Sequence, residues 1–312
     1  MPAPIFGTLK RLLIPMLRCL FASYLLLPGN ATAEPLPIVA SFSILADLTK
    51  QVGGDRVQIH TLVGPGSDAH VYQPTPSDAR TLARARMVIV NGLGFEGWIE
   101  RLVKSSGYRG KLIVASQGIS PLHQTRTRPD QHDAHDGDLD PHAWQDASNA
   151  ARYVDNIAQA LAEADPASRP LYQANATRLK REIADADKEI RTGFRNIPAE
   201  QRKVVTSHDA FGYFGRAYGI RFIAPVGANT DAEPTAADVA AIIRQIRREK
   251  VRAIFVENSI DPRLLERISR ESGARIGGAL YSDSLAPPGT PAGTYVGMMR
   301  LNARTLASAL AD

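Results

Sequence analysis

The amino-acid sequence predicts an α/β protein of two lobes, each a mainly parallel sheet flanked by helices, joined by one long rigid connecting helix. Strand-like apolar runs alternate with helix-like stretches in both halves of the chain, which is typical of βαβ units and parallel sheets. A polar segment rich in helix-forming residues separates the halves. The chain has 312 residues, or 279 after subtraction of a 33-residue leader, which is long for one hydrophobic core and suits two domains.

The first 33 residues have the layout of a secretory signal peptide. Three basic residues begin the segment, the short apolar run 19–27 follows, and small residues precede a cleavage point after Ala33. The run is too short to span a bilayer comfortably, so a buried or membrane-anchoring N-terminal helix is the weaker alternative. Cys19 lacks the preceding small residues of a lipoprotein signal. We therefore expect a protein secreted to the periplasm.

Charge and cysteine content exclude several classes of partner and ligand. The leader contains three basic and no acidic residues, so its removal lowers Lys+Arg from 37 to 34 against 32 Asp+Glu, and the net charge from +5 to +2. No basic stripe with interleaved aromatic residues remains, which argues against nucleic acid as a partner. The only cysteine lies in the leader. A metal site in the mature chain must therefore use histidine and carboxylate ligands, and the chain fits a bacterial periplasm.

The N-terminal lobe is predicted over residues 34–164. Two of its apolar runs, "MVIVNG" and "KLIVAS", are continuous, as in strands buried on both faces. "SILADLTKQVGG" has helical spacing and a Gly-Gly stop, and "PTPSDARTLARA" has the proline-rich entrance of a helix. The strands are expected over 37–43, 57–63, 87–92 and 111–116, and the helices over 43–54 and 74–85. Segment 123–140 is dense in Asp, His and Arg, and we expect it to be a mobile loop.

The connecting helix is predicted over residues 165–198. A helix of thirty residues would be about 45 Å long, enough to cross a whole domain. It would hold the lobes at a nearly fixed separation, whereas a Gly-Ser linker would let them hinge widely. The alternative is two surface helices with a break near Ala184.

The C-terminal lobe is predicted over residues 199–312 and repeats the alternation. "TAADVAAIIRQIRREK" (235–250) reads as a helix between strand-like runs. The expected strands are 203–207, 221–227, 252–258 and 275–281.

Four potential metal ligands follow strand-like runs and lie roughly seventy residues apart: His70, His142, His208 and Asp283. Because ligands of open parallel sheets bind outside the carboxyl ends of the strands, we expect these residues to meet in the cleft between the lobes. Taken singly, each histidine could be a structural or surface residue. Together, three imidazoles and one carboxylate favour Zn²⁺ in a tetrahedral site, since Mn²⁺ usually takes more oxygen ligands.

The residues beside these ligands suggest further roles. A helix is expected to begin near Asp146, directly after His142, and Asp209 is expected to cap a helix that starts at Ala210. Ser282 or Ser284 could orient the Asp283 carboxylate.

Other residues are weaker candidates for the same chemistry. Glu257, at the end of a strand, is either a partner of a metal-bound histidine or a helix cap. Trp144 either shields the site or belongs to the core of a lobe. The loop histidines are candidates for auxiliary metal capture, or else chance residues of a solvated loop: His123, His132 and His135.

Several segments together resemble one family. "GPGSDAHVYQPTPSD", "LDPHAWQD", "VVTSHDAFGYFGRAYG", "DAEPTAADV", "IFVENSIDPR" and "YSDSLAPPGTPAGTYVGMM" look like the cluster A-I solute-binding proteins of bacterial ABC transporters for zinc and manganese. The resemblance covers the mature chain in order. It implies two α/β lobes joined by a rigid helix, with the metal held between them by His70, His142, His208 and Asp283. Manganese-carrying members typically have Glu where this chain has His208, so the chain is similar to the zinc branch.

The same resemblance sets the expected partners and leaves functional alternatives open. It implies a monomer that delivers Zn²⁺ to an inner-membrane permease with a cytosolic ATPase, and a periplasmic metallochaperone is a further candidate partner. The alternatives are a manganese-binding protein of the same family, an exported zinc hydrolase, and an adhesin or zinc buffer without a transporter. A hydrolase would need an open metal position for water, which Asp283 as a fourth ligand would close. If Asp283 were distant, Glu257 could serve as a general base.

Overall fold

The structure is a computed structural model that describes residues 1, 34–123, 139–231 and 233–311. The predicted signal peptide, His132, His135 and the interior of segment 123–140 lie outside the described residues. Across the described ranges, no helix combines the length and the apolar character needed to cross a membrane. Pro35–Asp312 form one compact unit, in which two α/β lobes are distinguished by their sheets.

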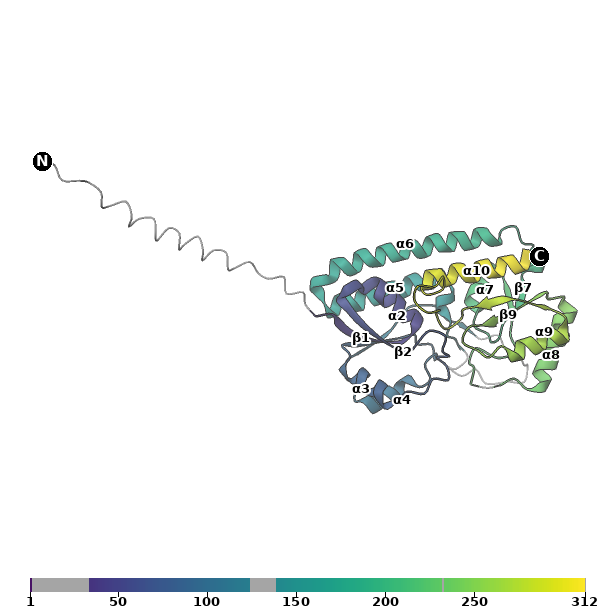
Figure 1. The fold of residues 1–312 in the computed structure, drawn as a ribbon, viewed down its shortest axis with the longest axis horizontal. Coiled ribbons are helices and arrows are strands. Elements are labelled where there is room, and N and C mark those ends of the chain that lie inside the picture. Colours follow the sequence, from purple (N-terminus) through teal and green to yellow (C-terminus); the bar gives the residue numbers. More distant parts are fainter. Residues whose placement is uncertain (2–33, 124–138, 232, 312) are drawn as a thin grey trace. The chain divides into compact units, whose positions relative to one another are not determined.

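The first lobe contains a four-stranded parallel sheet in the order β2-β1-β3-β4. Its strands are β1 (Leu36–Phe42), β2 (Val57–Val63), β3 (Met87–Val90) and β4 (Lys111–Val114). Its helices are α2 (Ser43–Gly53), η2 (Gly54–Arg56), α3 (Pro76–Arg84), α4 (Ile99–Ser106) and α5 (Ala147–Ala164). Figure 1 shows α2 and α5 on one side of this sheet and α3 and α4 on the other. Along the chain, the short antiparallel pair β5 (Leu122–His123) and β6 (Leu139–Asp140) and the turn η4 (Ala143–Gln145) come between β4 and α5.

The second lobe repeats the design with a parallel sheet in the order β10-β9-β7-β8. Its strands are β7 (Lys203–Val205), β8 (Arg221–Ile223), β9 (Ala253–Glu257) and β10 (Arg275–Leu280). Its helical segments are η6 (Ala199–Gln201), α7 (Gly212–Tyr218), α8 (Ala236–Glu249), α9 (Arg263–Ser272) and α10 (Tyr295–Ala311). The predicted fold class of two parallel-sheet lobes is confirmed.

Helix α6 (Arg169–Phe194) packs against both lobes, as the sequence predicted for a connecting helix. It contacts α2 and α5 of the first lobe and α10 of the second, and Figure 1 shows it along all three. It continues through Ala184 without a break. Its 26 residues give a length of about 39 Å, shorter than expected, because the turn η5 (Pro166–Ser168) precedes it and Pro198 soon follows it. Its buried residues recur every three or four positions: Tyr172, Ala176, Leu179, Ile183, Ala186, Ile190 and Phe194.

Helix starts follow local capping chemistry in most places. Asp146 caps α5 through Ser148 N–H, near the expected start, and Thr75 and Thr235 form capping boxes at α3 and α8. The expected cap at Asp209 is wrong, because α7 begins only at Gly212. His208 forms a β-bridge with Val226, and Asp209 N–H donates to the carbonyls of Val226 and Gly227, so the backbone is still paired laterally here.

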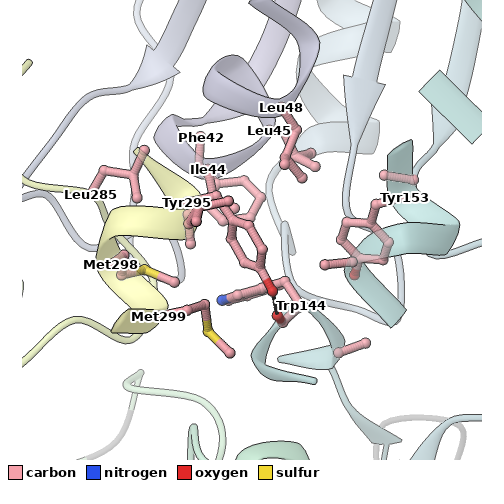
Figure 2. Close-up of a cluster of buried hydrophobic side chains, with 14 of the residues drawn as sticks. Phe42, Ile44, Leu45, Leu48, Trp144, Tyr153, Leu285, Tyr295, Met298 and Met299 are labelled. Atoms are coloured by element: carbon pink, nitrogen blue, oxygen red, sulfur yellow. Dashed lines mark hydrogen bonds between the residues drawn. The ribbon is translucent and has the colours of Figure 1, made fainter. Parts of the chain in front are cut away.

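The larger hydrophobic core is continuous between the two lobes. Figure 2 shows Phe42, Leu45 and Trp144 of the first lobe packed around Tyr295 and Met298 of α10. Tyr295 Oη donates a 2.7 Å hydrogen bond to the Trp144 carbonyl inside this cluster. A second, smaller core lies under α8 and α9 in the second lobe. The lobes therefore share a dry seam on the side of α6 and α10.

Candidate metal centre

Four residues from four separate loops meet between the lobes. His70 follows β2, His142 lies two residues after β6, His208 lies between β7 and α7, and Asp283 follows β10. His70 is 7% exposed and the other three are at most 1% exposed. They are the one group of three or more potential metal ligands found among the described residues. The site is therefore enclosed on all sides by protein.

The ligand atoms of these residues converge at a spacing that suits one ion. His70 Nε2 lies 3.3 Å from His142 Nε2 and 3.4 Å from Asp283 Oδ2. Asp283 Oδ1 lies 3.4 Å from His142 Nε2, and Asp283 Oδ2 lies 3.1 Å from His208 Nε2. Four atoms about 2.0–2.2 Å from a tetrahedral ion are about 3.3–3.6 Å apart, so the observed distances are close to those a small cation imposes.

The polar atoms at the centre have no other use in the part of the chain that the structure describes. Both oxygens of Asp283 and Nε2 of His208 are buried and lack a hydrogen-bond partner of good geometry, although they lie within contact distance of one another. Buried polar groups are otherwise nearly always satisfied. Unsatisfied acceptors that face one another are the arrangement expected around a cation, so the residues present fit a metal ion.

The charges of the site stabilise each other in the absence of metal. Burial disfavours the ionised form of Asp283, but His208 and His142 outweigh it and hold the pKa of Asp283 well below its usual value. Burial also disfavours the imidazolium of His208, yet Glu257 and Asp283 raise the pKa of His208 well above its usual value. In the metal-free site, a proton on His208 therefore supplies part of the positive charge that a bound cation would supply.

Two carboxylates contact the outer ring nitrogens of the histidines. Asp140 Oδ1 lies 2.8 Å from His142 Nδ1, and Glu257 Oε2 lies 2.9 Å from His208 Nδ1. Glu257 Oε1 also accepts the N–H groups of Ser207 and His208 at 2.8 and 3.0 Å. Glu257 thus contacts His208 and the chain beside it rather than the start of a helix. Such carboxylates fix the tautomer of a metal-binding histidine and leave Nε2 free for the metal.

Asp140 was not among the residues singled out from the sequence. It was placed in the expected mobile loop, but Leu139 and Asp140 pair with β5, and Asp140 is 4% exposed. A local signal did exist, since Asp140-Pro-His142 repeats the Asp-x-His spacing of Asp68-Ala-His70. In both turns the aspartate Oδ1 accepts the N–H of the histidine, at 3.0 and 2.9 Å.

The segment that carries Asp283 is attached to the first lobe. The Ser282 carbonyl accepts from Trp144 Nε1 and Gln145 Nε2, both at 2.9 Å. On the other side of Asp283, the Ser284 hydroxyl accepts from the Gly66 N–H at 2.5 Å. Contrary to expectation, neither serine hydroxyl bonds the Asp283 carboxylate in the described structure: the Ser284 hydroxyl bonds backbone groups, and the Ser282 hydroxyl is buried without a partner.

Aromatic rings cover the site from the first lobe. Phe95 packs edge-on against His70 with ring centroids 4.7 Å apart, and Trp144 packs against His142 at 5.4 Å. Trp144 is fully buried in the shared core, so it belongs to the core and adjoins the site at once. His123 lies on β5, is exposed, and is outside the four-residue group.

Comparison with known proteins gives matches over nearly the whole chain. A family model described as the periplasmic zinc-uptake complex component A (ZnuA) matches residues 38–309. The manganese ABC transporter substrate-binding lipoprotein PsaA of Streptococcus pneumoniae is 32% identical over 90% of this chain and 91% of its own length. The iron-binding protein YfeA of Yersinia pestis is 34% identical over 88% and 86%.

Solved structures with the same fold carry different metals. The periplasmic zinc-binding protein TroA of Treponema pallidum superposes with a TM-score of 0.81 at 29% identity, covering 89% of this chain and 99% of that protein. A manganese-bound periplasmic metal-binding protein of Candidatus Liberibacter asiaticus gives a TM-score of 0.78 at 30% identity, covering 88% and 98%. The relatives therefore agree on the fold and differ in the metals they are named for.

Proposed function

Because the chain belongs to the periplasmic zinc-uptake complex component A family, we propose that it captures Zn²⁺ and delivers it to an ABC-type permease. Proteins of this family are substrate-binding components of transporters, not enzymes. The metal is thus cargo, and an inner-membrane permease with its cytosolic ATPase is the expected receiver. A single observation carries the proposal for the site: three imidazole Nε2 atoms and one carboxylate converge in a buried cluster, and both Asp283 oxygens and His208 Nε2 have no hydrogen-bond partner among the described residues.

The ligand roles of His70, His142, His208 and Asp283 are part of this proposal. Three nitrogens and one oxygen at the spacing of a tetrahedral ion support Zn²⁺. Full burial also leaves little room for a metal-bound water, which favours a carrier over a hydrolase.

Manganese is the second candidate cargo, and two observations favour it. Several relatives are named manganese ABC transporter substrate-binding lipoproteins or a manganese-binding lipoprotein. In addition, Asp283 turns Oδ1 toward His142 and Oδ2 toward His70 and His208, so both of its oxygens face the site. A carboxylate that binds through two oxygens would add the oxygen ligation that Mn²⁺ prefers.

Metal analysis and competition test the proposal directly. The mature protein should bind about one Zn²⁺ per chain and prefer Zn²⁺ to Mn²⁺ in a competitive titration. Replacing His70, His142 and His208 by alanine together should abolish this binding, whereas His60→Ala, at an exposed position in β2, should leave it intact. Unchanged stoichiometry in the triple variant would eliminate the site. A preference for Mn²⁺ in the unmodified protein would transfer the proposal to manganese.

His208 is the position at which selectivity can be changed. His208→Glu replaces a nitrogen ligand by a hard oxygen ligand, so the Zn²⁺/Mn²⁺ affinity ratio should fall. His208→Ala removes the ligand and should weaken both metals, which separates lost coordination from altered preference.

Location and partners complete the proposal. We propose that residues 1–33 are a cleaved signal peptide, that the lobes comprise residues 34–164 and 199–312, and that the protein is a periplasmic monomer. Streptococcal relatives are lipoproteins, so a lipid anchor is the alternative. Mass spectrometry of the mature N-terminus distinguishes a chain that begins at Glu34 from one that carries lipid on Cys19. Loss of zinc uptake in a deletion strain, with no other zinc importer present, would distinguish transport from buffering or adhesion.

A further inference from the structure

Inter-lobe contacts at the metal centre are of two kinds. On the side of α6 and α10 the lobes share the buried core drawn in Figure 2. In the loop that carries His70 the two lobes are connected by polar contacts: besides the bond from Gly66 N–H to Ser284, Thr230, in the loop between β8 and α8, donates its hydroxyl to Asp68 Oδ2 at 2.8 Å. Asp68 and Thr230 are both partly exposed, whereas the seam residues are buried. The contact between Thr230 and Asp68 is therefore polar and partly exposed, whereas the seam is apolar and buried.

Asp68 is the residue that joins this contact to a metal ligand. Its Oδ1 accepts the N–H of His70 at 2.9 Å, while its Oδ2 accepts the Thr230 hydroxyl. One carboxylate therefore fixes the backbone of His70 and binds the opposite lobe at the same time.

The second Asp-x-His turn also brings its aspartate close to the second lobe, although without a hydrogen bond from that lobe to the side chain in the described structure. Asp140 Oδ1 accepts from His142, and Asp140 Oδ2 faces Gly212 at the start of α7 in the second lobe. A Cβ atom at Gly212 would lie 2.5 Å from Asp140 Oδ2, so the two lobes approach closely there as well. Each histidine ligand of the first lobe thus has an aspartate placed between it and the second lobe.

We propose that Asp68 is a positioning residue that couples His70 to lobe closure, and that its hydrogen bond with Thr230 acts as a latch slowing metal release. This inference rests on the proposed metal-binding function. The metal is enclosed by ligands from both lobes, so it can leave only when the lobes part. Breaking the latch should therefore raise the dissociation rate and leave coordination of the closed site unchanged.

The test measures Zn²⁺ dissociation from the mature protein into excess chelator by stopped flow. Thr230→Val keeps the shape of the side chain and removes the hydroxyl, and Thr230→Ser keeps the hydroxyl. We expect about a three- to twenty-fold faster dissociation for Thr230→Val, in the range of one partly exposed hydrogen bond to a charged acceptor, and a rate near that of the unmodified protein for Thr230→Ser. The ligand-field spectrum of bound Co²⁺ should be the same in all three proteins.

A double-mutant cycle separates the latch from a general loosening of the loop. Asp68→Ala should speed release and also alter the Co²⁺ spectrum, because His70 loses its backbone acceptor. In the Asp68→Ala background, Thr230→Val should add little further effect. Asn229→Ala removes two hydrogen bonds with Asp231 inside the same loop and leaves the groups of the Asp68 contact in place, so it is the control for a loosened loop and should change the release rate less than Thr230→Val does.

The outcomes are distinct for the latch and for the proposed function. Equal release rates for Thr230→Val and Thr230→Ser, or a full effect of Thr230→Val without Asp68, would overturn the latch while metal binding stood. If the unmodified protein bound neither Zn²⁺ nor Co²⁺, the proposed function would fail first. Melting of each metal-free variant confirms that the loop substitutions leave the fold intact.

Discussion

At the scale of single residues, Glu257 contacts both the ring and the backbone of His208, the histidine that the second lobe contributes to the site. Its Oε2 lies 2.9 Å from His208 Nδ1, and its Oε1 holds the backbone before and at His208. A glutamine there keeps an oxygen for the backbone donors but removes the negative charge opposite the ring. The Glu257→Gln variant thus separates two contributions of Glu257 to metal binding: the position of the His208 backbone and the basicity of the His208 ring.

Glu257→Gln should weaken Zn²⁺ binding by about ten- to a hundred-fold, because the outer carboxylate orients the imidazole and raises its basicity. Competition with a chelating dye measures the affinity. Glu189→Gln, which changes a surface carboxylate paired with Arg300, is the matched control and should have no effect. An affinity equal to that of the control would mean that Glu257 acts only on the backbone.

The four residues that cluster between the lobes could be found from the sequence. Of the residues that contact them or hold their loops, Asp140 and Thr230 could not. Each ligand follows a strand-like run, and topology then brings such positions to one edge. The partner of Asp68 is Thr230, which lies 162 positions away, and nothing local to either residue indicates the contact. Asp140 was missed for another reason: a polar neighbourhood suggested a loop, although the Asp-x-His spacing was present.

At the scale of elements, Asp47 on α2 bears on the start of α10. Its Oδ2 accepts the N–H of Tyr295, the first residue of α10, at 2.8 Å. Burial raises the pKa of Asp47 to about 6, and the hydrogen bond from Tyr295 only partly opposes this. The first N–H of α10 gains a hydrogen-bond acceptor in Asp47, but burial makes the ionised form of Asp47 unfavourable.

Asp47→Asn should therefore stabilise the protein relative to the unmodified chain near pH 7.5, and Asp47→Ala should be about 1 kcal/mol less stable than Asp47→Asn, because the Tyr295 N–H loses its acceptor. A folded pKa above the unfolded one means that stability contributed by Asp47 is present below pH 4 and is lost as pH rises to about 6. Roughly 1–3 kcal/mol is involved, at 1.36 kcal/mol per pKa unit. Denaturant titrations at pH 4.5 and 7.5 measure it. An Asn variant with the same pH dependence as the unmodified chain would contradict the assignment.

Element boundaries show where local sequence ceases to be sufficient. The long helix α6 is evident from its polar helix-forming composition, and prolines near its ends account for its limits. The start of α7 was misplaced because the bridge between His208 and Val226 is a tertiary contact that keeps the chain extended. A capping rule applied to Asp209 contains no information about β8.

At the scale of the whole molecule, the shared core predicts that the two lobes unfold together. Met299 of α10 is 2% exposed and belongs to the cluster that includes Trp144. Met299→Ala should lower the free energy of unfolding by about 2–5 kcal/mol and the melting temperature by about 2–4 °C per kcal/mol.

Both tryptophans, Trp98 and Trp144, lie in the first lobe, so their fluorescence reports that lobe, whereas far-UV circular dichroism reports all helices. The two midpoints should fall together. A lower dichroism midpoint with unchanged fluorescence would show that the lobes unfold separately.

Metal release by acid is the other property of the whole molecule. A histidine must be neutral to bind metal, so bound metal and bound protons exclude each other. In the metal-free site, burial opposes a charge on His208, but Glu257 and Asp283 raise the pKa of His208 well above its ordinary value of 6.5. Below that raised pKa the incoming metal must displace a proton, and the apparent affinity should fall by about tenfold per pH unit. The decline should therefore already be present above pH 6.5, because the pKa of His208 is raised. Chelator competition between pH 8 and pH 5 measures this dependence.

Because Asp283 has its pKa held well below the usual range, it stays ionised throughout this interval and does not contribute to the slope. An affinity that stayed flat across these values would mean that the histidines are not the ligands.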